Sequence, residues 1–423
     1  MGYLGFQVCL TNIEYVFANV SRAVSKIYSW WFDLPLYSLI PYVTERLKLE
    51  TNFINEANNS EKMKALVDNE PRLKGRVYIP EVYRDLSSRR IMTAEFVEGV
   101  RLWDKETLTS PWYGGSGKGS PGAGGTPLDP LPTSVTNNIT SYNHIKADRN
   151  EWKGRSGKGG LGLSLKEVMT TMIDLFSAQM FLFGTVHCDP HPGNIFIRRL
   201  PNGHPELVLI DHGLYVNMRP ELRHQYCAFW KAIMTFDNKT IEDITLKWGI
   251  KAPDLFASAT LLRPYTGGDG STMERVTGEL TGKTPSERHY EVQNRLRQGI
   301  RDVLSEEEKF PQELMFIGRN MRIVQGNNQF LGSPVNRIKL TGFWASRSLA
   351  EAKDLDWRQR WTNAWRHVLF RFVLFGTDVA FWTARVRQKL GWGGGLEDDL
   401  EKQMRFIAKD QFGFELQHDV FEG

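Results

Sequence analysis

Three oxygen-bearing side chains in the middle of the chain have the spacing that phosphoryl transfer requires. Asp189 and Asn194 lie in the segment 187–194 (HCDPHPGN), and Asp211 opens the triplet 211–213 (DHG). A phosphoryl group in transfer needs a proton acceptor for the incoming hydroxyl and hard oxygen ligands for magnesium, more than it needs covalent catalysis. Asp189 suits the first role, and Asn194 and Asp211 suit the second, in the order that kinase active sites use. The sequence therefore predicts a catalytic and magnesium-binding site.

Each part of this pattern also has a simpler explanation. Asp-Pro and Pro-Gly-Asn are common in turns, and Asp-His-Gly can close a tight turn after a strand. His187, Asp189 and His191 alternate and could instead offer three ligands to zinc or iron. Pro190 and Pro192 argue against a regular strand there, and no further His or Cys cluster completes a shell. The ordered and correctly spaced set favours the kinase-like interpretation.

The elements around the motif must bring these side chains together. Residues 164–167 (SLKE) match a capping box and predict a helix that Gly184 ends. The apolar runs 195–197 and 207–210, joined by a turn-rich connection, predict a hairpin. A helix, a polar loop and a hairpin in this order place the three oxygen-bearing side chains at the mouth of one cleft.

The segments upstream have three different characters. Apolar periodicity predicts a helix over 42–69, and the β-rich runs 77–83 and 90–97 predict a hairpin across a polar connection. Residues 110–163 are rich in Gly, Ser, Pro, Lys and Thr, and such a segment cannot bury enough surface to offset its ordering entropy. We predict that this segment is a disordered insert.

Composition and charge limit the class of protein. The 423 residues are 41% hydrophobic and carry a net charge of +4 with acidic and basic residues interleaved, which predicts a globular protein and no nucleic-acid partner. The three cysteines match neither a disulfide framework nor a zinc site, so we expect a reducing compartment. The apolar stretch 368–382 is interrupted by charges and is shorter than the roughly 18 residues that span a bilayer. No targeting sequence is legible at the N-terminus.

The motifs resemble those of the UbiB, or aarF-domain, atypical kinase family. The Pro-His-Pro-Gly core of 187–194 and the segment 211–215 (DHGLY) carry the resemblance. The segment 49–58 (LETNFINEAN) is similar to the Glu-x-Asp element of that family and to the helix whose Glu pairs with the nucleotide-binding Lys. The resemblance implies that Glu50 and Glu56 have these two roles.

The same resemblance implies a fold, a nucleotide site and cofactors. Residues 90–99 resemble the strand and hinge, in which Glu95 and Val97 would offer backbone groups to adenine, and ATP and Mg²⁺ are the implied cofactors. The implied fold is α+β and protein-kinase-like, with a partial N-lobe made of a helix and a β hairpin, and a mostly helical C-lobe. The implied organisation is a helical N-terminal segment (1–40), a partial kinase N-lobe and hinge (41–109), the disordered insert (110–163), a kinase-like C-lobe (164–350) and a helical C-terminal extension (351–423).

Two departures from the family pattern affect the prediction. Asn52 stands where the family has the Asp of its Glu-x-Asp pair. The Lys-x-Gly-Gln element, the Ala-rich phosphate loop and the Val-Ala-x-Lys strand of the family are not found before Glu56, so we interpret the chain either as N-terminally incomplete or as a degraded member of the family. The Asp-His-Gly variant implies the mitochondrial branch, linked to lipid or coenzyme Q homeostasis, and so a mitochondrial location with association with the inner membrane.

We therefore expect a UbiB-like kinase or ATPase that uses ATP and magnesium and binds nucleotide. A pseudokinase that binds a lipid or a partner protein without turnover is the alternative that the missing lysine suggests. A small-molecule phosphotransferase of the aminoglycoside or choline kinase kind shares the motif, but the Pro-His-Pro-Gly core and Glu50 disfavour it. The aromatic and basic residues of 357–372 fit either a buried helix or a peripheral helix on an anionic membrane.

Overall fold

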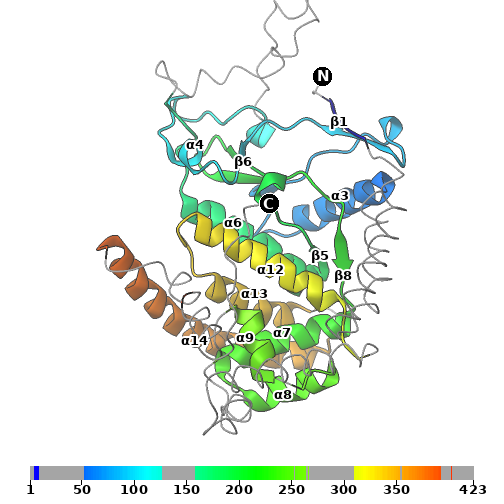
Figure 1. The fold of residues 1–423 in the computed structure, drawn as a ribbon, viewed down its shortest axis with the longest axis vertical. Coiled ribbons are helices and arrows are strands. Elements are labelled where there is room, and N and C mark those ends of the chain that lie inside the picture. The colour runs from blue at the N-terminus through cyan, green and yellow to red at the C-terminus, as the bar shows by residue number, and fades with distance from the viewer. Residues whose placement is uncertain are drawn as a thin grey trace, which may run out of the picture. The chain divides into compact units, whose positions relative to one another are not determined.

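The computed structural model (Figure 1) shows two compact units. The first contains the described residues within 1–10, 49–175 and 189–215, and the second contains those within 11–48, 176–188 and 216–423. These units do not follow the expected boundary between an N-lobe and a C-lobe at residue 164, because the segment 189–215 belongs with the first unit. The described residues are 4–8, 52–125, 158–251, 253–262, 265, 309–352, 355–391 and 402.

A four-stranded sheet with the order β2-β7-β6-β4 forms the centre of the first unit. Its strands β6 (Ile195–Arg199) and β7 (Pro205–Leu209) form the predicted antiparallel hairpin, with Ile195 opposite Leu209. The short strands β2 (Val77–Tyr78) and β4 (Val100–Arg101) pair with β7 and β6 respectively. Every residue of β7 is buried, so the hairpin that follows the motif is the core of this sheet.

The predicted hairpin between 77–83 and 90–97 is mostly wrong. Strand β3 (Ile91–Glu95) pairs along its whole length with β1 (Leu4–Val8), which also shows that the expected helical segment 1–40 contains a strand. Only a single bridge, between Val82 and Ala94, joins the two predicted runs. Pro80 has no N–H to donate to a ladder, so the first run divides into β2 and the bridged residues. The apolar residues of β1 alternate, as in a strand.

Helix α3 (Phe53–Asp68) confirms the predicted helix over its described part, and residues 42–51 lie outside the described residues. Asn52 caps the helix, because its side-chain oxygen accepts the N–H of Ile54 at 3.2 Å. Phe53 and Ala57 pack against Met92 of β3. The helix is therefore fixed at its first turn by a polar cap and by apolar contacts with β3.

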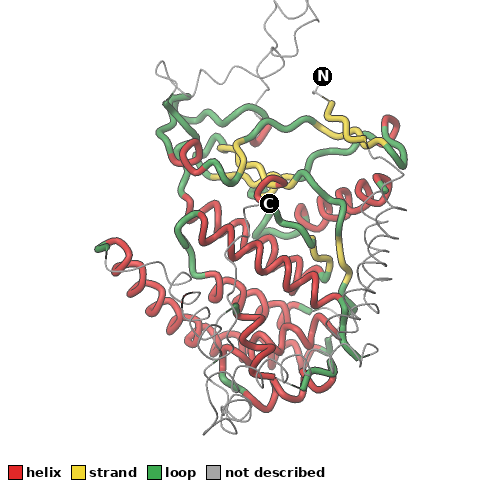
Figure 2. The backbone as a smooth tube through the Cα atoms, viewed as in Figure 1, coloured by secondary structure: helices red, strands yellow, loops and turns green. Residues whose placement is uncertain are grey.

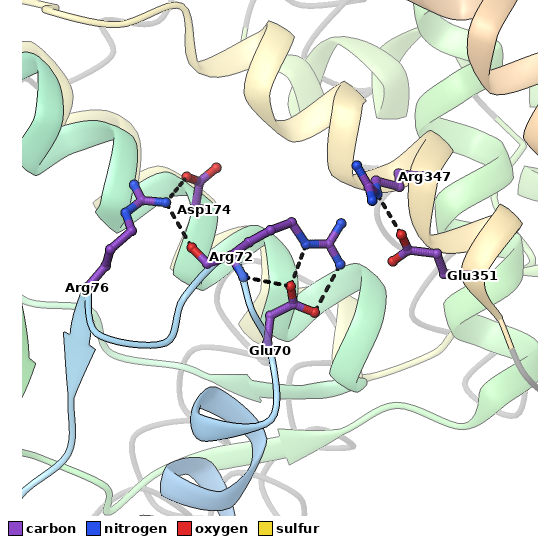
Figure 3. A network of polar contacts seen from close by, with 6 residues as sticks. All are labelled: Glu70, Arg72, Arg76, Asp174, Arg347 and Glu351. Atoms are coloured by element: carbon purple, nitrogen blue, oxygen red, sulfur yellow. Dashed lines mark hydrogen bonds and ion pairs between the residues drawn. The ribbon is translucent and has the colours of Figure 1, made fainter.

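The segment after α3 is tied to helix α6 (Leu165–Ser177) by ionic contacts within the first unit. Arg76 donates to Asp174 at 3.0 Å (Figure 3). It also donates to the hydroxyl of Thr171 at 2.8 Å. Arg72, which lies four residues before Arg76, pairs with Glu70, as Figure 3 also shows. These contacts fix the entry into β2.

Both ends of the expected disordered insert are ordered, and its middle, 126–157, lies outside the described residues. Leu161 donates its N–H to the carbonyl of Thr107 in α4 (Lys105–Thr109), and Ser120 exchanges two hydrogen bonds with Arg199 of β6. A Cβ on Gly160 would lie 2.2 Å from the Thr107 oxygen, so the close approach needs glycine. Composition predicted disorder here because few side chains are apolar, whereas backbone hydrogen bonds hold the segment.

The second unit is mostly helical, as Figure 2 shows. Helix α6 continues into a π-helical segment, Ala178–Phe183, and ends at Gly184 as predicted, with a positive φ of 66°. A two-stranded sheet of β5 (Thr185–His187) and β8 (Tyr215–Asn217) follows. The helices after it are α7 (Pro220–Thr235), α8 (Asn238–Lys247), α9 (Pro253–Leu261), α12 (Glu313–Phe330), α13 (Arg337–Glu351) and α14 (Trp357–Lys389).

Helix α13 packs between α7 and α14 and connects them through one apolar cluster. The cluster contains Met234 of α7, Ile338 of α13, and Phe370 and Leu374 of α14, all nearly inaccessible to solvent. Along the solvent side of α13, Arg347 pairs with Glu351 one turn later (Figure 3). In the described residues, no helix is both long enough and apolar enough to cross a membrane.

Candidate active site

Asn194 and Asp211 come together at one end of the β6–β7 hairpin. Asn194 ends a 3₁₀ turn immediately before β6, and Asp211 lies two residues after β7. Because the two strands are antiparallel, the residue before one and the residues after the other lie side by side. The amide Nδ2 of Asn194 donates to Oδ2 of Asp211 at 3.0 Å, and the Ile210 N–H donates to the Asn194 carbonyl at 3.1 Å. The hairpin therefore brings the two predicted metal ligands into direct contact.

The Asp211 carboxylate is held in place through both oxygens. Its Oδ1 accepts the N–H of Gly213 at 2.9 Å while Oδ2 accepts the Asn194 amide. With Nδ2 of Asn194 used in this way, Oδ1 of Asn194 is its remaining donor atom for a cation. Amide and carboxylate oxygens are the ligands that Mg²⁺ prefers, so the donor set of this pair fits magnesium.

Asp189 lies in the same unit as this pair and is half-buried. The loop that follows it is closed by His191, whose Nδ1 accepts the N–H of Gly193 at 3.1 Å and caps the turn Pro192–Asn194. The edge of the His191 ring meets Trp103, with 6.0 Å between ring centroids. These contacts give His191 a structural role in shaping the loop between Asp189 and Asn194.

The residues before Asp189 are fixed by side chains of the second unit. His187 is fully buried and packs edge-on against Phe176. Its N–H donates to Gln179 at 2.9 Å, and its carbonyl accepts the side-chain amide of Asn320 in α12 at 2.6 Å. Among the described residues no group of three or more His, Cys, Asp and Glu side chains could hold a metal ion. The zinc or iron alternative for His187, Asp189 and His191 is therefore wrong.

His212 is buried and makes two hydrogen bonds through its ring. Nε2 lies 3.2 Å from the carbonyl of Leu209, and Nδ1 lies 2.9 Å from the hydroxyl of Tyr215. A carbonyl can only accept, so Nε2 carries a proton, and in the neutral ring Nδ1 accepts from the tyrosine hydroxyl. The His212 and Tyr215 rings are also stacked, with an interplanar angle of 3°. The middle residue of Asp-His-Gly is thus a polar anchor for the segment that carries Asp211.

Helix α3 holds the same segment through the peptide of His212. The side-chain amide of Asn59 donates to the His212 carbonyl at 3.0 Å, and the carboxylate of Glu56 accepts the His212 N–H at 3.4 Å. Glu56 is buried, with 3% of its surface exposed. The resemblance implied that Glu56 pairs with a nucleotide-binding lysine, and the structure places its carboxylate next to the residue after Asp211.

The predicted hinge residues have partners inside the first unit. The Glu95 carboxylate accepts the hydroxyl of Tyr78 at 2.5 Å and the N–H of Glu81 at 3.2 Å, and its own N–H donates to the Glu81 carbonyl at 2.7 Å. Burial and this carboxylate raise the pKa of Tyr78. The side chain of Val97 is buried. Glu50, the remaining predicted site residue, lies outside the described residues.

A buried ion pair joins the adjacent strands β6 and β7 beside Tyr78. Arg198 of β6 donates through Nε to Glu206 of β7 at 2.7 Å, and its guanidinium lies 4.5 Å from the centre of the Tyr78 ring. Burial raises the pKa of Glu206, and Arg198 opposes that shift. Because both side chains are almost fully buried, each charge depends on the other for compensation.

Comparison with known proteins identifies the family to which the chain belongs. Residues 10–245 match the ABC1 atypical kinase-like domain, which is more than half of the chain and includes all the predicted site residues. The chain belongs to the ABC1 atypical kinase-like family. The α+β, kinase-like fold and the resemblance to UbiB and aarF-domain proteins are both confirmed.

Several curated ABC1 relatives are similar to the chain. It is 38% identical over 90% of its length to the ABC1 family protein lscO of Purpureocillium lilacinum, and 29% identical over 78% of its length to the ABC1 family protein C10F6.14c of Schizosaccharomyces pombe. It is also 34% identical over 46% of its length to the probable serine/threonine-protein kinase abkB of Dictyostelium discoideum. The chain spans 57%, 51% and 21% of these relatives respectively, so it corresponds to part of each.

Four residues that support the motif segments of this ABC1 chain were missed in the sequence. Asn59, Gln179 and Asn320 each bond a backbone group of the motif, and Tyr215 bonds the ring of His212. A polar amide at a helical position that faces the core is a signal for such a role, because buried amides require partners. The partner itself could not be found from local sequence, since Asn59 and His212 lie 153 positions apart.

Proposed function

We propose that this ABC1 chain transfers or hydrolyses the terminal phosphoryl group of ATP in the presence of magnesium, with Asp189, Asn194 and Asp211 as its reactive site. The observation that carries the proposal is the contact between Asn194 and Asp211, in which three oxygen donor atoms are held by the β6–β7 hairpin and by Gly213. Magnesium bound there would neutralise charge on the phosphates.

We assign three further roles in the proposed reaction to individual side chains. Asp189 accepts the proton of the attacking hydroxyl or orients a water molecule in its place, because its half-buried carboxylate stands at the start of the turn that His191 closes before Asn194. Asn194 and Asp211 provide the oxygen ligands for magnesium, and the hydrogen bond between their side chains keeps these oxygens close together. Glu56 and Asn59 keep the His212 peptide, and hence the Asp211 carboxylate, in one orientation.

In the predicted hinge, Glu95 has fewer backbone groups available for adenine than the sequence suggested. The N–H of Glu95 is bonded to Glu81, so Glu95 can offer adenine its carbonyl oxygen and Val97 its backbone groups. We propose that the activity serves lipid or coenzyme Q homeostasis in mitochondria, as the Asp-His-Gly-Leu-Tyr sequence supports. The names of abkB and of a second Dictyostelium relative, abkD, as probable serine/threonine-protein kinases support phosphotransfer as the reaction class.

Binding and turnover by the full chain test this proposal separately. Wild-type protein saturated with Mg-ATP at 100 times its dissociation constant should be stabilised by about 2.7 kcal/mol. Asp211→Asn should lose the magnesium-dependent part of this stabilisation, while Asp189→Asn should keep it and lose ATP turnover. Asp243→Asn, an exposed aspartate of α8, is the matched control and should behave as wild type.

Each outcome decides between the functions considered. Unchanged magnesium-dependent binding in Asp211→Asn would refute the metal assignment. Binding of Mg-ATP by the wild type with no turnover would favour the pseudokinase, and no binding of nucleotide at all would favour a scaffold. Loss of turnover in Asp189→Asn with retained binding would support the role of Asp189.

A further inference from the structure

Helix α14 has two opposite apolar faces. One face packs on α13 and α7 through Phe370 and Leu374, each only 2% exposed. The other, the outer face of α14, is exposed to solvent, with Trp361 at 76% and Phe372 at 74%. The outer face consists of Trp361, Trp365, Val368, Phe372, Phe375, Val379, Trp382 and Val386, spaced alternately four and three residues apart.

Hydrogen bonds to α13 and its flanking turns fix the direction in which the outer face points. Asn336 donates to the carbonyl of Thr377 at 3.1 Å, Arg385 donates to the carbonyl of Gly332 at 2.8 Å, and Lys339 pairs with Asp378. These contacts occur along the C-terminal half of the helix. The outer face therefore points away from α13 as a consequence of packing rather than of free rotation.

The apolar area of the outer face is too large for an ordinary surface. Its five aromatic and three valine side chains expose on the order of 1,000 Å², since a single aromatic side chain can bury 150–250 Å². Monomeric soluble proteins rarely expose a contiguous apolar patch of more than a few hundred Å². A patch of this size indicates an interaction surface.

The charges of α14 indicate what the outer face contacts. The helix contains six Arg and one Lys against one Asp, a side-chain balance of 7 − 1 = +6, and its single acid is paired with Lys339. At about 100° per residue, Arg358 and Arg387 lie along one edge of the outer face, and Arg360 and Arg371 lie along the other. An apolar stripe with basic residues on both edges is typical of helices that lie in a membrane interface.

A second copy of the chain fits this face less well. Two copies would bring two strongly positive helices together, and paired helices prefer Ile, Val and Leu at positions spaced four and three apart. Five of the eight outer-face residues are Trp or Phe. Tryptophan is favoured instead at the level of lipid headgroups, where one side of the ring is apolar and the other is hydrated.

We infer that the outer face of α14 binds an anionic phospholipid membrane, with the helix lying along the surface. The aromatic side chains enter the boundary between headgroups and acyl chains, and the flanking arginines contact phosphate groups. The buried face of the same helix keeps the second unit attached along its length. This surface is separate from the proposed phosphotransfer site, so the two proposals can fail independently.

Co-sedimentation of the full chain with vesicles tests the inference. The vesicles are phosphatidylcholine alone, or phosphatidylcholine mixed with phosphatidylglycerol, at equal total lipid. Wild-type protein should bind the anionic vesicles and lose binding as salt is raised. Because each basic residue near such a surface contributes about fivefold in affinity, replacing Arg358, Arg360, Arg371 and Arg387 by Gln should weaken binding by roughly a hundredfold or more.

A second variant tests the aromatic residues. Trp361→Ser combined with Phe372→Ser should weaken binding to anionic vesicles by at least about tenfold, and should leave binding of Mg-ATP unchanged. Tyr113→Ser removes an aromatic residue that is 57% exposed in the first unit, and this matched control should bind vesicles as the wild type does. All replaced residues are exposed, so far-ultraviolet circular dichroism should show folded proteins.

Two results would overturn the inference. The first is sedimentation of wild type with anionic vesicles that is no stronger than that of both variants, which includes no binding by any of them. The second is a wild-type dimer by light scattering that becomes monomeric in Trp361→Ser with Phe372→Ser, which would show that the outer face joins two copies. If the aromatic variant fails to fold, the arginine variant alone decides between these results.

Discussion

Replacing His212 by Phe should destabilise the segment that carries Asp211, although the two side chains have similar size and both suit a buried position. Phe keeps the stacking on the Tyr215 ring but removes both ring nitrogens. The Tyr215 hydroxyl and the Leu209 carbonyl then lose the partners that they have at 2.9 and 3.2 Å. The change therefore isolates the polar contribution of His212 from its packing.

The expected cost follows from these two groups. A buried polar group left without its partner costs about 1–3 kcal/mol. Leu209 also belongs to the β6–β7 ladder, and a carbonyl oxygen has two lone pairs, so its loss is at the low end of this range. We expect a total of about 3 kcal/mol for His212→Phe. Adding Tyr215→Phe removes the hydroxyl that lacks a partner, and the double variant should recover about 1–2 kcal/mol.

Hydrogen exchange of peptides that cover 205–215 measures this cost locally, which matters because a chain with two compact units need not unfold in one step. A loss of about 3 kcal/mol corresponds to exchange that is faster by roughly a hundredfold. His204→Phe is the control, because that side chain is 63% exposed, and its effect should stay within about 0.5 kcal/mol. Exchange in His212→Phe that matches the control would refute the assignment of both ring hydrogen bonds.

Two further predictions concern stability. Arg198→Met should lower the free energy of unfolding by about 3–5 kcal/mol in urea, because it leaves the Glu206 carboxylate buried without its partner, and Arg198→Met with Glu206→Leu should restore most of it. Burial, then the charges of Arg347, Arg371 and Lys231, lower the pKa of His367 below 6.5. The unfolded chain therefore binds the His367 proton more readily than the folded chain does. The contribution of the neutral His367 to the free energy of unfolding is complete above pH 6.5 and is lost as the pH falls through 6.5 towards the folded pKa. Melting temperatures measured across this pH range should show the loss.

Controls keep these two effects specific. If Arg198→Met and the double variant are equally unstable, the loss comes from packing rather than from the unpaired carboxylate. Glu351 is the acidic group near His367 and partly offsets the repulsion, so Glu351→Gln should steepen the loss at low pH. The variant His367→Phe should flatten the dependence near pH 6.5, and an unchanged profile would contradict the role of His367.

The parts of the fold that local sequence predicts are those with local causes. The β6–β7 hairpin and the end of α6 at Gly184 follow from apolar runs and from a glycine with positive φ, and both were predicted. The run 77–83 contains β-forming residues on both sides of Pro80, and only the structure shows that its first two residues pair with β7 instead of with β3. The choice of partner strand depends on contacts far away in the chain.

In the candidate site, too, the local contacts could be predicted from the sequence and the long-range ones could not. The contact between Asn194 and Asp211 follows from the motif spacing and the hairpin, because the turn joins two adjacent strands. The anchoring of His212 by Asn59, and of His187 by Asn320, joins segments more than one hundred positions apart. Helical periodicity can mark such an amide as one that faces the core and needs a partner, but nothing in its local sequence identifies which distant backbone group it bonds.

Two hydrogen bonds connect helix α3 to the backbone of His212, one to its carbonyl and one to its N–H, so the helix and the Asp-His-Gly segment are expected to move together. A displacement of α3 stretches both bonds together, because Asn59 holds the carbonyl of His212 and Glu56 holds its N–H. These two groups belong to the peptide units on either side of His212, and the first of these units also contains the carbonyl of Asp211. The backbone that follows Asp211 is therefore held by a helix that begins more than 150 positions earlier in the chain, so a displacement of α3 would also displace the segment that carries the Asp211 carboxylate.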